Sequence, residues 1–196
     1  MKKLISFIPF ILLSCDNYQS QQNTIKTSSI TKNSKQQDII SESITYDEYI
    51  KAGEQHLKDN NIDYAIKEFN QAIKLDNKRV EAHYGLGVSK AIICFNNNNL
   101  CNEAIIDLNT VISINPNYKK AYFNISICKT KISDFKGALD ALDKAINQDP
   151  NDPDYYINKG SIYLILNETA KACENFQEAL IKGSNSAKEK IKLYCE

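Results

Sequence analysis

The chain has 196 residues, of which 42% are hydrophobic and 24% charged, a composition typical of a globular domain and not of a disordered or fibrous chain. Lysine plus arginine and aspartate plus glutamate both number 24, so the formal net charge is zero. A nucleic-acid-binding protein usually carries a basic excess or a basic stripe. Neither is visible in this sequence, and that class of function is set aside.

Residues 1–14 resemble an export signal. They open with a methionine and two lysines, run mostly apolar from Leu4 to Leu13 and end in Ser14. A basic start, a short apolar core and a small residue before a cleavage site are typical of a secretory signal peptide. The apolar run is about ten residues long, whereas a membrane-spanning helix needs about twenty, so the pattern favours a signal peptide over a transmembrane anchor.

The sequence Leu12-Leu13-Ser14-Cys15 resembles the bacterial lipobox. In that motif the small residue lets the signal peptidase approach, and the cysteine thiol accepts diacylglycerol before cleavage. The resemblance implies a lipoprotein modified at Cys15 with fatty acyl chains such as palmitate, and several chains give stable anchoring. The alternative is a secreted protein whose signal ends near a cysteine. We expect a lipid-anchored protein of the bacterial cell envelope, on the periplasmic side, with the choice of inner or outer membrane open.

Residues 15–44 are predicted to be the lipidated cysteine and a disordered tether. From Asp16 to about Ser43 the chain is rich in Gln, Ser, Thr, Asn and Lys, with no aromatic residue after Tyr18 and no apolar period. A flexible chain of this length spans on the order of 30 Å. It would hold the following domain away from the membrane.

The remainder of the chain repeats with a period of 34 residues. Gly53 and Gly87 are 34 positions apart, and so are Ser126 and Gly160. The step from Gly87 to Ser126 is 39, and we place the five additional residues in the polar turn Asn96–Asn99, where an insertion costs little. Each segment also repeats an aromatic residue or histidine, an alanine and a large apolar residue: Tyr49, Ala65 and Phe69; His83, Ala104 and Leu108; Tyr122, Ala138 and Leu142; Tyr156, Ala172 and Phe176.

This pattern resembles the tetratricopeptide repeat, a helix-turn-helix unit of 34 residues. The resemblance covers about residues 45–186 and departs from the family pattern in having no Trp and no Pro after the first and fourth repeats. It implies an all-α fold, a right-handed superhelical solenoid of four units with a C-terminal capping helix. The units are residues 46–79, 80–118, 119–152 and 153–186, and the cap is residues 187–196.

The repeat positions have a simple packing interpretation. The small residues let the second helix of a unit lie close to the first, and the large apolar residues fill the space between units. A single unit cannot bury its apolar face, so stacking creates the core. In the cap we expect four side chains to face inward, namely Ala187, Ile191, Leu193 and Tyr194.

Two pairs of cysteines are symmetric about predicted helix turns. The midpoint of Cys94 and Cys101 lies in the inserted turn, and the midpoint of Cys173 and Cys195 lies next to Gly183. Residues equidistant from the turn of an antiparallel hairpin face each other. We therefore predict two disulfides, as suits an exported protein. The alternative is four buried thiols that act as small hydrophobic side chains.

The sequence offers no metal site, cofactor site or catalytic constellation. No CxxC motif is present, and His56 and His83 fall on different predicted helices, where they take packing positions of the repeat. Cys128 is expected to pack between units, with a reactive thiol or an intermolecular disulfide left open. There is no Gly-rich phosphate loop and no G-x-S-x-G or H-E-x-x-H motif. We expect no enzyme activity, no metal, no cofactor and no small-molecule substrate.

The resemblance further implies that the first helix of each unit lines a concave groove that binds a peptide or an amphipathic helix of a partner protein. We expect Tyr84 and Phe123 to be its central aromatic anchors, at positions that the fold does not require. The alternative is that loops or the tether cover these side chains. The ten predicted groove residues are Ile50, Glu54, Tyr84, Val88, Lys120, Phe123, Ile127, Ile157, Ser161 and Leu164, with Asp47, Glu81, Lys120 and Asp154 along one rim.

Two functions fit these features. The first is a membrane-anchored adaptor that binds one partner protein. The second is a subunit of an envelope assembly machine, as in tetratricopeptide lipoproteins of outer-membrane protein insertion or of pilus and secretin assembly. Some members of the family clamp C-terminal carboxylates with Lys and Asn residues. Only Lys120, Asn124 and Asn158 are candidates here, so this mode is disfavoured.

Overall fold

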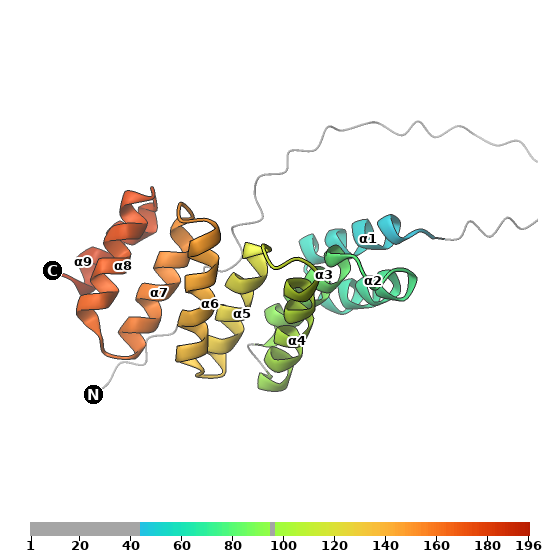
Figure 1. Cartoon of the computed structure of the whole chain (residues 1–196), viewed down its shortest axis with the longest axis horizontal. Coiled ribbons are helices and arrows are strands. Elements are labelled where there is room, and N and C mark those ends of the chain that lie inside the picture. Colours follow the sequence, from blue (N-terminus) through green and yellow to red (C-terminus); the bar gives the residue numbers. More distant parts are fainter. Residues whose placement is uncertain (1–43, 95–96) are drawn as a thin grey trace, which may run out of the picture. The chain divides into compact units, whose positions relative to one another are not determined.

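The computed structural model describes residues 44–94 and 97–196. The predicted signal peptide, Cys15 and nearly all of the predicted tether lie outside the described residues. Within them every regular element is an α-helix (Figure 1). The helices are α1 (Tyr46–Lys58), α2 (Ile62–Leu75), α3 (Val80–Ile93), α4 (Asn98–Ile114), α5 (Lys119–Lys131), α6 (Phe135–Gln148), α7 (Pro153–Ile165), α8 (Thr169–Ile181) and α9 (Asn185–Tyr194).

The helices from α1 to α8 pair into four hairpins that follow one another in chain order (Figure 1). Within a hairpin the first helix packs on the second, and each second helix packs on the first helix of the following hairpin. The first helices also contact each other in sequence, α1 with α3, α3 with α5 and α5 with α7. The helical repeat solenoid expected from the sequence is confirmed.

The repeated positions form the buried core. The side chains of Phe69 and Phe176 are 1% and 0% exposed. A Cβ atom on Gly53 would lie 2.7 Å from the Phe69 ring, and one on Gly160 would lie 2.6 Å from the Phe176 ring. Because glycine has no side chain, the backbone of the first helix can lie directly against the phenylalanine ring of the second helix at these two positions.

The first, third and fourth hairpins, whose turns are fully described, turn through a residue in the left-handed region. Asn60, Ser133 and Asn167 have φ values of 58°, 66° and 60°, and Gly183 plays the same part before α9 with φ 95°. The residue after each of these donates its N–H to a carbonyl near the end of the preceding helix, which is the bond pattern of a Schellman cap. This cap ends the helix and reverses the chain within three residues.

The insertion of the second repeat is absorbed differently from our prediction. Helix α4 has 17 residues, whereas α2 and α6 have 14 and α8 has 13. Asn97 caps α4 by accepting a hydrogen bond from the N–H of Asn99 at 3.0 Å, so the helix begins at Asn98. Three of the five additional residues extend the start of α4, one extends the end of α3, and one lengthens the connection. The polar run that we predicted to be a turn is therefore partly the capped first turn of α4.

The last helix, α9, begins at Asn185, where the sequence also predicts the start of a final helix. Ala187 is fully buried and packs toward α8, while Leu193 is 71% exposed. The expectation that Leu193 faces inward is wrong. In a helix, residues four and seven positions after Ala187 share its face, and the residue six positions after it lies about 120° away.

Candidate functional site

We define the first-helix face as the ten residues predicted to line the groove on α1, α3, α5 and α7. Glu54 and Lys120 are exposed, and Ile127 is buried at 8% exposure. The other seven are partly buried, namely Ile50, Tyr84, Val88, Phe123, Ile157, Ser161 and Leu164. The face thus offers side chains of intermediate exposure from all four repeats.

The two predicted aromatic anchors pack between repeats. The Tyr84 ring centroid lies 5.0 Å from that of Tyr118, and its hydroxyl accepts a hydrogen bond from Asn124 Nδ2 at 3.2 Å. Phe123 lies 5.2 Å from the Tyr155 ring. Both rings border buried clusters of neighbouring repeats. Contrary to our expectation, the fold does use them, because successive first helices are close enough for a ring on one to contact the next.

The predicted groove needs one correction, at Ile127, because this side chain is buried. Helix α5 packs against both α3 and α7, and these two helices cover the part of α5 on which Ile127 lies. Three other apolar residues of the face differ from Ile127 and from the two aromatic anchors, namely Val88, Ile157 and Leu164. Each of the three is partly buried, so each keeps part of its apolar side chain exposed on the first-helix face.

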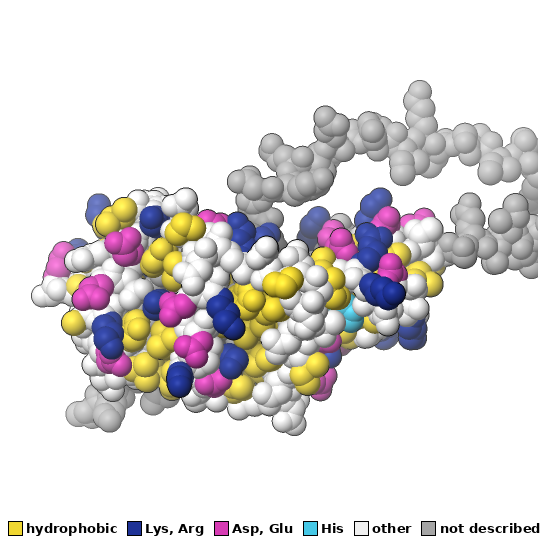
Figure 2. Space-filling view, viewed as in Figure 1, with side chains coloured by type: hydrophobic (Ala, Val, Ile, Leu, Met, Phe, Trp, Pro, Cys, Tyr) yellow, Lys and Arg dark blue, Asp and Glu magenta, His cyan; other side chains and the backbone are white. Residues whose placement is uncertain are grey.

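Apolar side chains also gather elsewhere on the surface. On the side drawn in Figure 2, they lie over the middle of the helical array near α4 and α5, with charged side chains of both signs around them. On the second helices, Ile106 is 65% exposed and Ile181 is 72% exposed. These two isolated residues provide controls for any binding test of the first-helix face.

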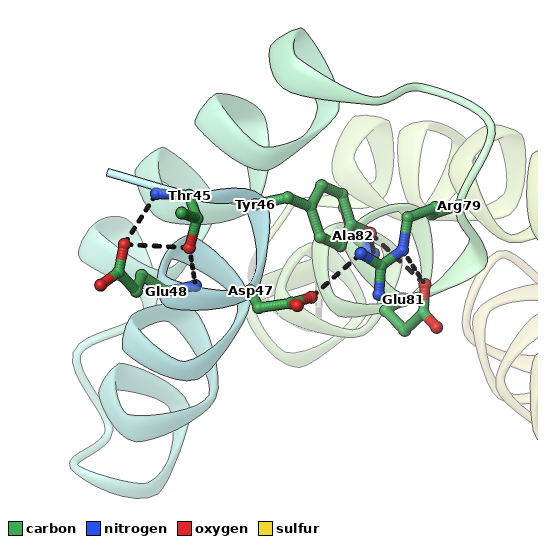
Figure 3. A network of polar contacts seen from close by, with 7 residues as sticks. All are labelled: Thr45, Tyr46, Asp47, Glu48, Arg79, Glu81 and Ala82. Atoms are coloured by element: carbon green, nitrogen blue, oxygen red, sulfur yellow. Dashed lines mark hydrogen bonds and ion pairs between the residues drawn. The ribbon is translucent and has the colours of Figure 1, made fainter. Parts of the chain in front are cut away.

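An arginine that the sequence analysis missed neutralises part of the predicted rim (Figure 3). Arg79 Nη1 lies 3.0 Å from Asp47 Oδ1, and its Nε lies 3.5 Å from Glu81 Oε2. The guanidinium stacks 3.9 Å from the ring centroid of Tyr46. The Tyr46 hydroxyl donates to Glu81 at 3.4 Å and accepts from the N–H of Ala82 at 3.1 Å. The only sequence signal was a lone arginine directly before α3.

The start of α1 lies beside this network (Figure 3). Glu48 Oε2 accepts a hydrogen bond from the N–H of Thr45 at 2.7 Å, and Thr45 Oγ1 accepts one from the N–H of Glu48 at 3.3 Å. This reciprocal pair is a capping box, which satisfies two N–H groups that the helix itself leaves open. It fixes the first helix of the repeat domain at Tyr46.

The rim of the third and fourth repeats has opposite charges. Lys120 is exposed, and Asp154 is partly buried at the equivalent position, the second residue of its helix. Burial and the neighbouring Asp152 both raise the pKa of the Asp154 carboxyl. A shallow hollow of about 270 Å³ lies at the start of α5, lined by residues 117–120.

Four cysteines form two disulfides in the structure. Cys94 and Cys101 join the end of α3 to the start of α4, with a Cα–Cα distance of 4.9 Å. Cys173 and Cys195 tie α8 to α9, with a Cα–Cα distance of 5.8 Å. Cys128 is free and fully buried, in the same cluster as the first pair. Burial raises the pKa of its thiol to about 12, which makes it a poor nucleophile.

For the isolated protein we predict the same two disulfides and the same free thiol. Peptide mapping of the unreduced protein by mass spectrometry should find Cys94 linked to Cys101 and Cys173 linked to Cys195. Iodoacetamide should leave Cys128 unmodified until the protein is unfolded, because the buried thiol is protonated at neutral pH. Alkylation of Cys94 or Cys173 in the unreduced protein would contradict the predicted pairing.

The described residues show no grouping that could hold a metal ion. Among them, no three His, Cys, Asp or Glu side chains are placed to hold a metal ion. His56 stacks on Tyr64 with ring centroids 5.4 Å apart, and His83 Nε2 lies 3.0 Å from the Asn77 carbonyl. Both histidines serve packing or turns. No helix in this part of the chain is long and apolar enough to cross a membrane.

Comparisons with known proteins agree with the repeat pattern. A family model described as TPR repeat matches residues 53–91, and one described as tetratricopeptide repeat matches residues 141–174. Hsp70-Hsp90 organizing protein 3 of Arabidopsis thaliana is 36% identical over 78 residues, which are 40% of this chain and 14% of that protein. The matches to curated relatives span between 13% and 18% of those proteins' length.

Solved structures show the same fold. A crystal structure of MamA superposes with a TM-score of 0.61 and 25% identity, over 70% of this chain and 72% of that one. TTC0263, a thermophilic TPR protein of Thermus thermophilus, superposes with a TM-score of 0.62 and 21% identity, over 71% of this chain and 75% of that one. Residues 53–91 and 141–174 therefore match tetratricopeptide repeats, and the described part of the chain folds as a helical repeat solenoid.

Proposed function

We propose that the chain is a membrane-anchored interaction module that binds a peptide or helix of a partner protein on its first-helix face. The observation that carries this proposal is that Val88, Ile157 and Leu164 are apolar and remain partly exposed on the first-helix face. Apolar side chains that neither fill the core nor are fully solvated are typical of a surface that a partner covers. The name of the Arabidopsis relative, an organizing protein for two chaperones, supports a protein as the partner.

The anchoring part of the proposal rests on Leu12-Leu13-Ser14-Cys15 and on the cysteines of the repeat domain. Disulfides persist in oxidising compartments, and the two pairs in the structure suit the periplasmic side of an envelope membrane. The lipid would hold the module at the membrane, and residues 16–44 would give it reach toward a partner in the same compartment.

Replacing Val88, Ile157 and Leu164 together by alanine should weaken partner binding by at least about 1.4 kcal/mol, or tenfold. The free energy of unfolding should fall less than for the substitution of a fully buried residue, since these side chains are only partly buried. The measurement is a pull-down from detergent-solubilised envelopes, followed by titration of the partner it recovers.

The matched control replaces Ile106 and Ile181 by alanine, because these are exposed apolar residues on second helices. Equal loss of binding in both variants would contradict the first-helix face as the binding surface. The same pull-down separates the two functional readings. A single stoichiometric membrane complex indicates a subunit of an assembly machine, and a set of soluble proteins indicates an adaptor.

A further inference from the structure

Several polar side chains of α5 and α7 near the first-helix face donate hydrogen bonds within the chain. Asn124 Nδ2 donates to the carbonyl of Lys120 at 2.9 Å and to the Tyr84 hydroxyl at 3.2 Å. Asn158 Nδ2 donates to the carbonyl of Asp154 at 2.8 Å. A carbonyl oxygen can only accept, so the amide nitrogen must face the helix backbone. The amide oxygens of both asparagines are then left as acceptors.

The hydroxyl groups of these helices follow the same rule. Ser161 Oγ donates to the carbonyl of Ile157 at 2.8 Å, and Thr130 Oγ1 donates to the carbonyl of Ser126 at 2.8 Å. A hydroxyl has one donor and two acceptor lone pairs, so each still accepts once its proton is used. Besides the ammonium of Lys120 and the second amide proton of Asn158, the polar groups that these side chains offer to a ligand on this half of the face are acceptors.

Asp154 adds a charge to these acceptors. It lies one helical turn before Asn158 on the same side of α7. Its N–H donates to Asp152 Oδ1, and its carboxylate forms no ion pair with any Lys or Arg of the described residues. Burial and the neighbouring Asp152 raise the pKa of the Asp154 carboxyl, because both disfavour its charged form. A cation supplied by a ligand would stabilise the charged form.

We propose that the α5–α7 half of the first-helix face binds an extended peptide segment that carries a lysine or arginine side chain, with its cation on Asp154 and its N–H groups on the oxygens of Asn124, Asn158 and Ser161. This inference rests on the proposed function. It names the chemistry of the partner that the same face would select. The exposed ammonium of Lys120, at the equivalent position on α5, disfavours a cation there and so fixes the register of the segment.

The acceptor surface discriminates between kinds of ligand. A C-terminal carboxylate needs donors, and Asn124 has both amide protons engaged within the chain. A helical ligand uses its main-chain N–H groups within its own turns, apart from the first few. An extended segment presents free main-chain N–H groups along its length. It therefore matches a row of acceptors better than either alternative.

The test uses the full-length chain in detergent micelles and a phage-displayed library of random peptides about 12 residues long, roughly 40 Å when extended. Enriched peptides should share a lysine or arginine at one position. With the best synthetic peptide, Asp154→Asn should weaken binding about tenfold. Asp140→Asn, which removes an exposed carboxylate from α6, should leave binding unchanged. Selection on Asp154→Lys should enrich aspartate or glutamate at the same position, an outcome that a purely structural role of Asp154 cannot produce.

The outcomes that contradict this inference can be told apart from those that contradict the proposed function. Peptides that lose affinity with the Val88, Ile157 and Leu164 triple variant, but lack a shared basic residue or ignore Asp154→Asn, would overturn this inference and leave the proposed function standing. Peptides that ignore both the triple variant and Asp154→Asn would overturn both. A library that yields no enriched peptide would count against peptide binding on this face and against this inference with it.

Discussion

Phe69→Ala is expected to lower the free energy of unfolding by about 3–5 kcal/mol, the usual cost of deleting a buried aromatic side chain. The ring is 1% exposed and lies against Gly53 of α1 and Gly85 of α3, so it joins the first repeat to the second. Its removal leaves a cavity that two helix backbones line. The loss should appear in chemical denaturation, and hydrogen exchange should locate it in α1 and α2, because an end repeat has a single neighbour.

The matched control is Tyr64→Ala, which removes an aromatic ring from the same helix at a site that is 56% exposed. A surface substitution usually changes stability by no more than about 0.5 kcal/mol, and we expect a value near this limit. If Phe69→Ala costs no more than Tyr64→Ala, then the ring does not hold the first two repeats together, and the packing described for this end of the solenoid is wrong.

Cys15→Ser is expected to abolish lipid attachment and move the protein out of the membrane fraction. The thiol is the acceptor of diacylglycerol in the motif that Leu12-Leu13-Ser14-Cys15 resembles, and a serine hydroxyl does not replace it. A single acyl chain binds membranes weakly, whereas two or more bind stably. Loss of every acyl chain should therefore remove membrane attachment completely. The measurements are incorporation of labelled fatty acid and the distribution of the protein between membrane and soluble fractions.

Cys128→Ala provides the control for losing a cysteine, since Cys128 is buried and lies in the repeat domain. It should retain both the label and the membrane location. Labelled fatty acid that still enters Cys15→Ser would show that the lipid is attached elsewhere or that the label reports another modification. In either case the anchor proposed here would have to be abandoned.

The fold was accessible from the sequence because the repeat pattern records burial directly. Gly53, Phe69 and their counterparts recur at a fixed spacing, and these are the residues that close each hairpin and fill the space beneath it. Four copies of one pattern in phase make the period visible even where a single repeat departs from it. The structure adds that Asn60, Ser133 and Asn167, which have positive φ values, occupy one position of the repeat.

The details of the site were not accessible in the same way. Burial of Ile127 and the ring contacts of Tyr84 and Phe123 depend on how closely α5 approaches α3 and α7, and a repeat pattern does not encode that distance. The role of Arg79 depends on contacts across 32 positions of sequence, from Arg79 to Asp47. Such contacts arise only once the hairpins are stacked.

The central claim is that the first-helix face is the surface that a partner protein covers. The most direct measurement places a photo-crosslinking amino acid singly at Val88 and Leu164, and for comparison at Ile106 and Ile181, in the full-length protein in cells. The account predicts one shared crosslinked partner from Val88 and Leu164 and none from the two second-helix positions. The same partner crosslinked from Ile106 or Ile181, with nothing from Val88 or Leu164, would contradict it.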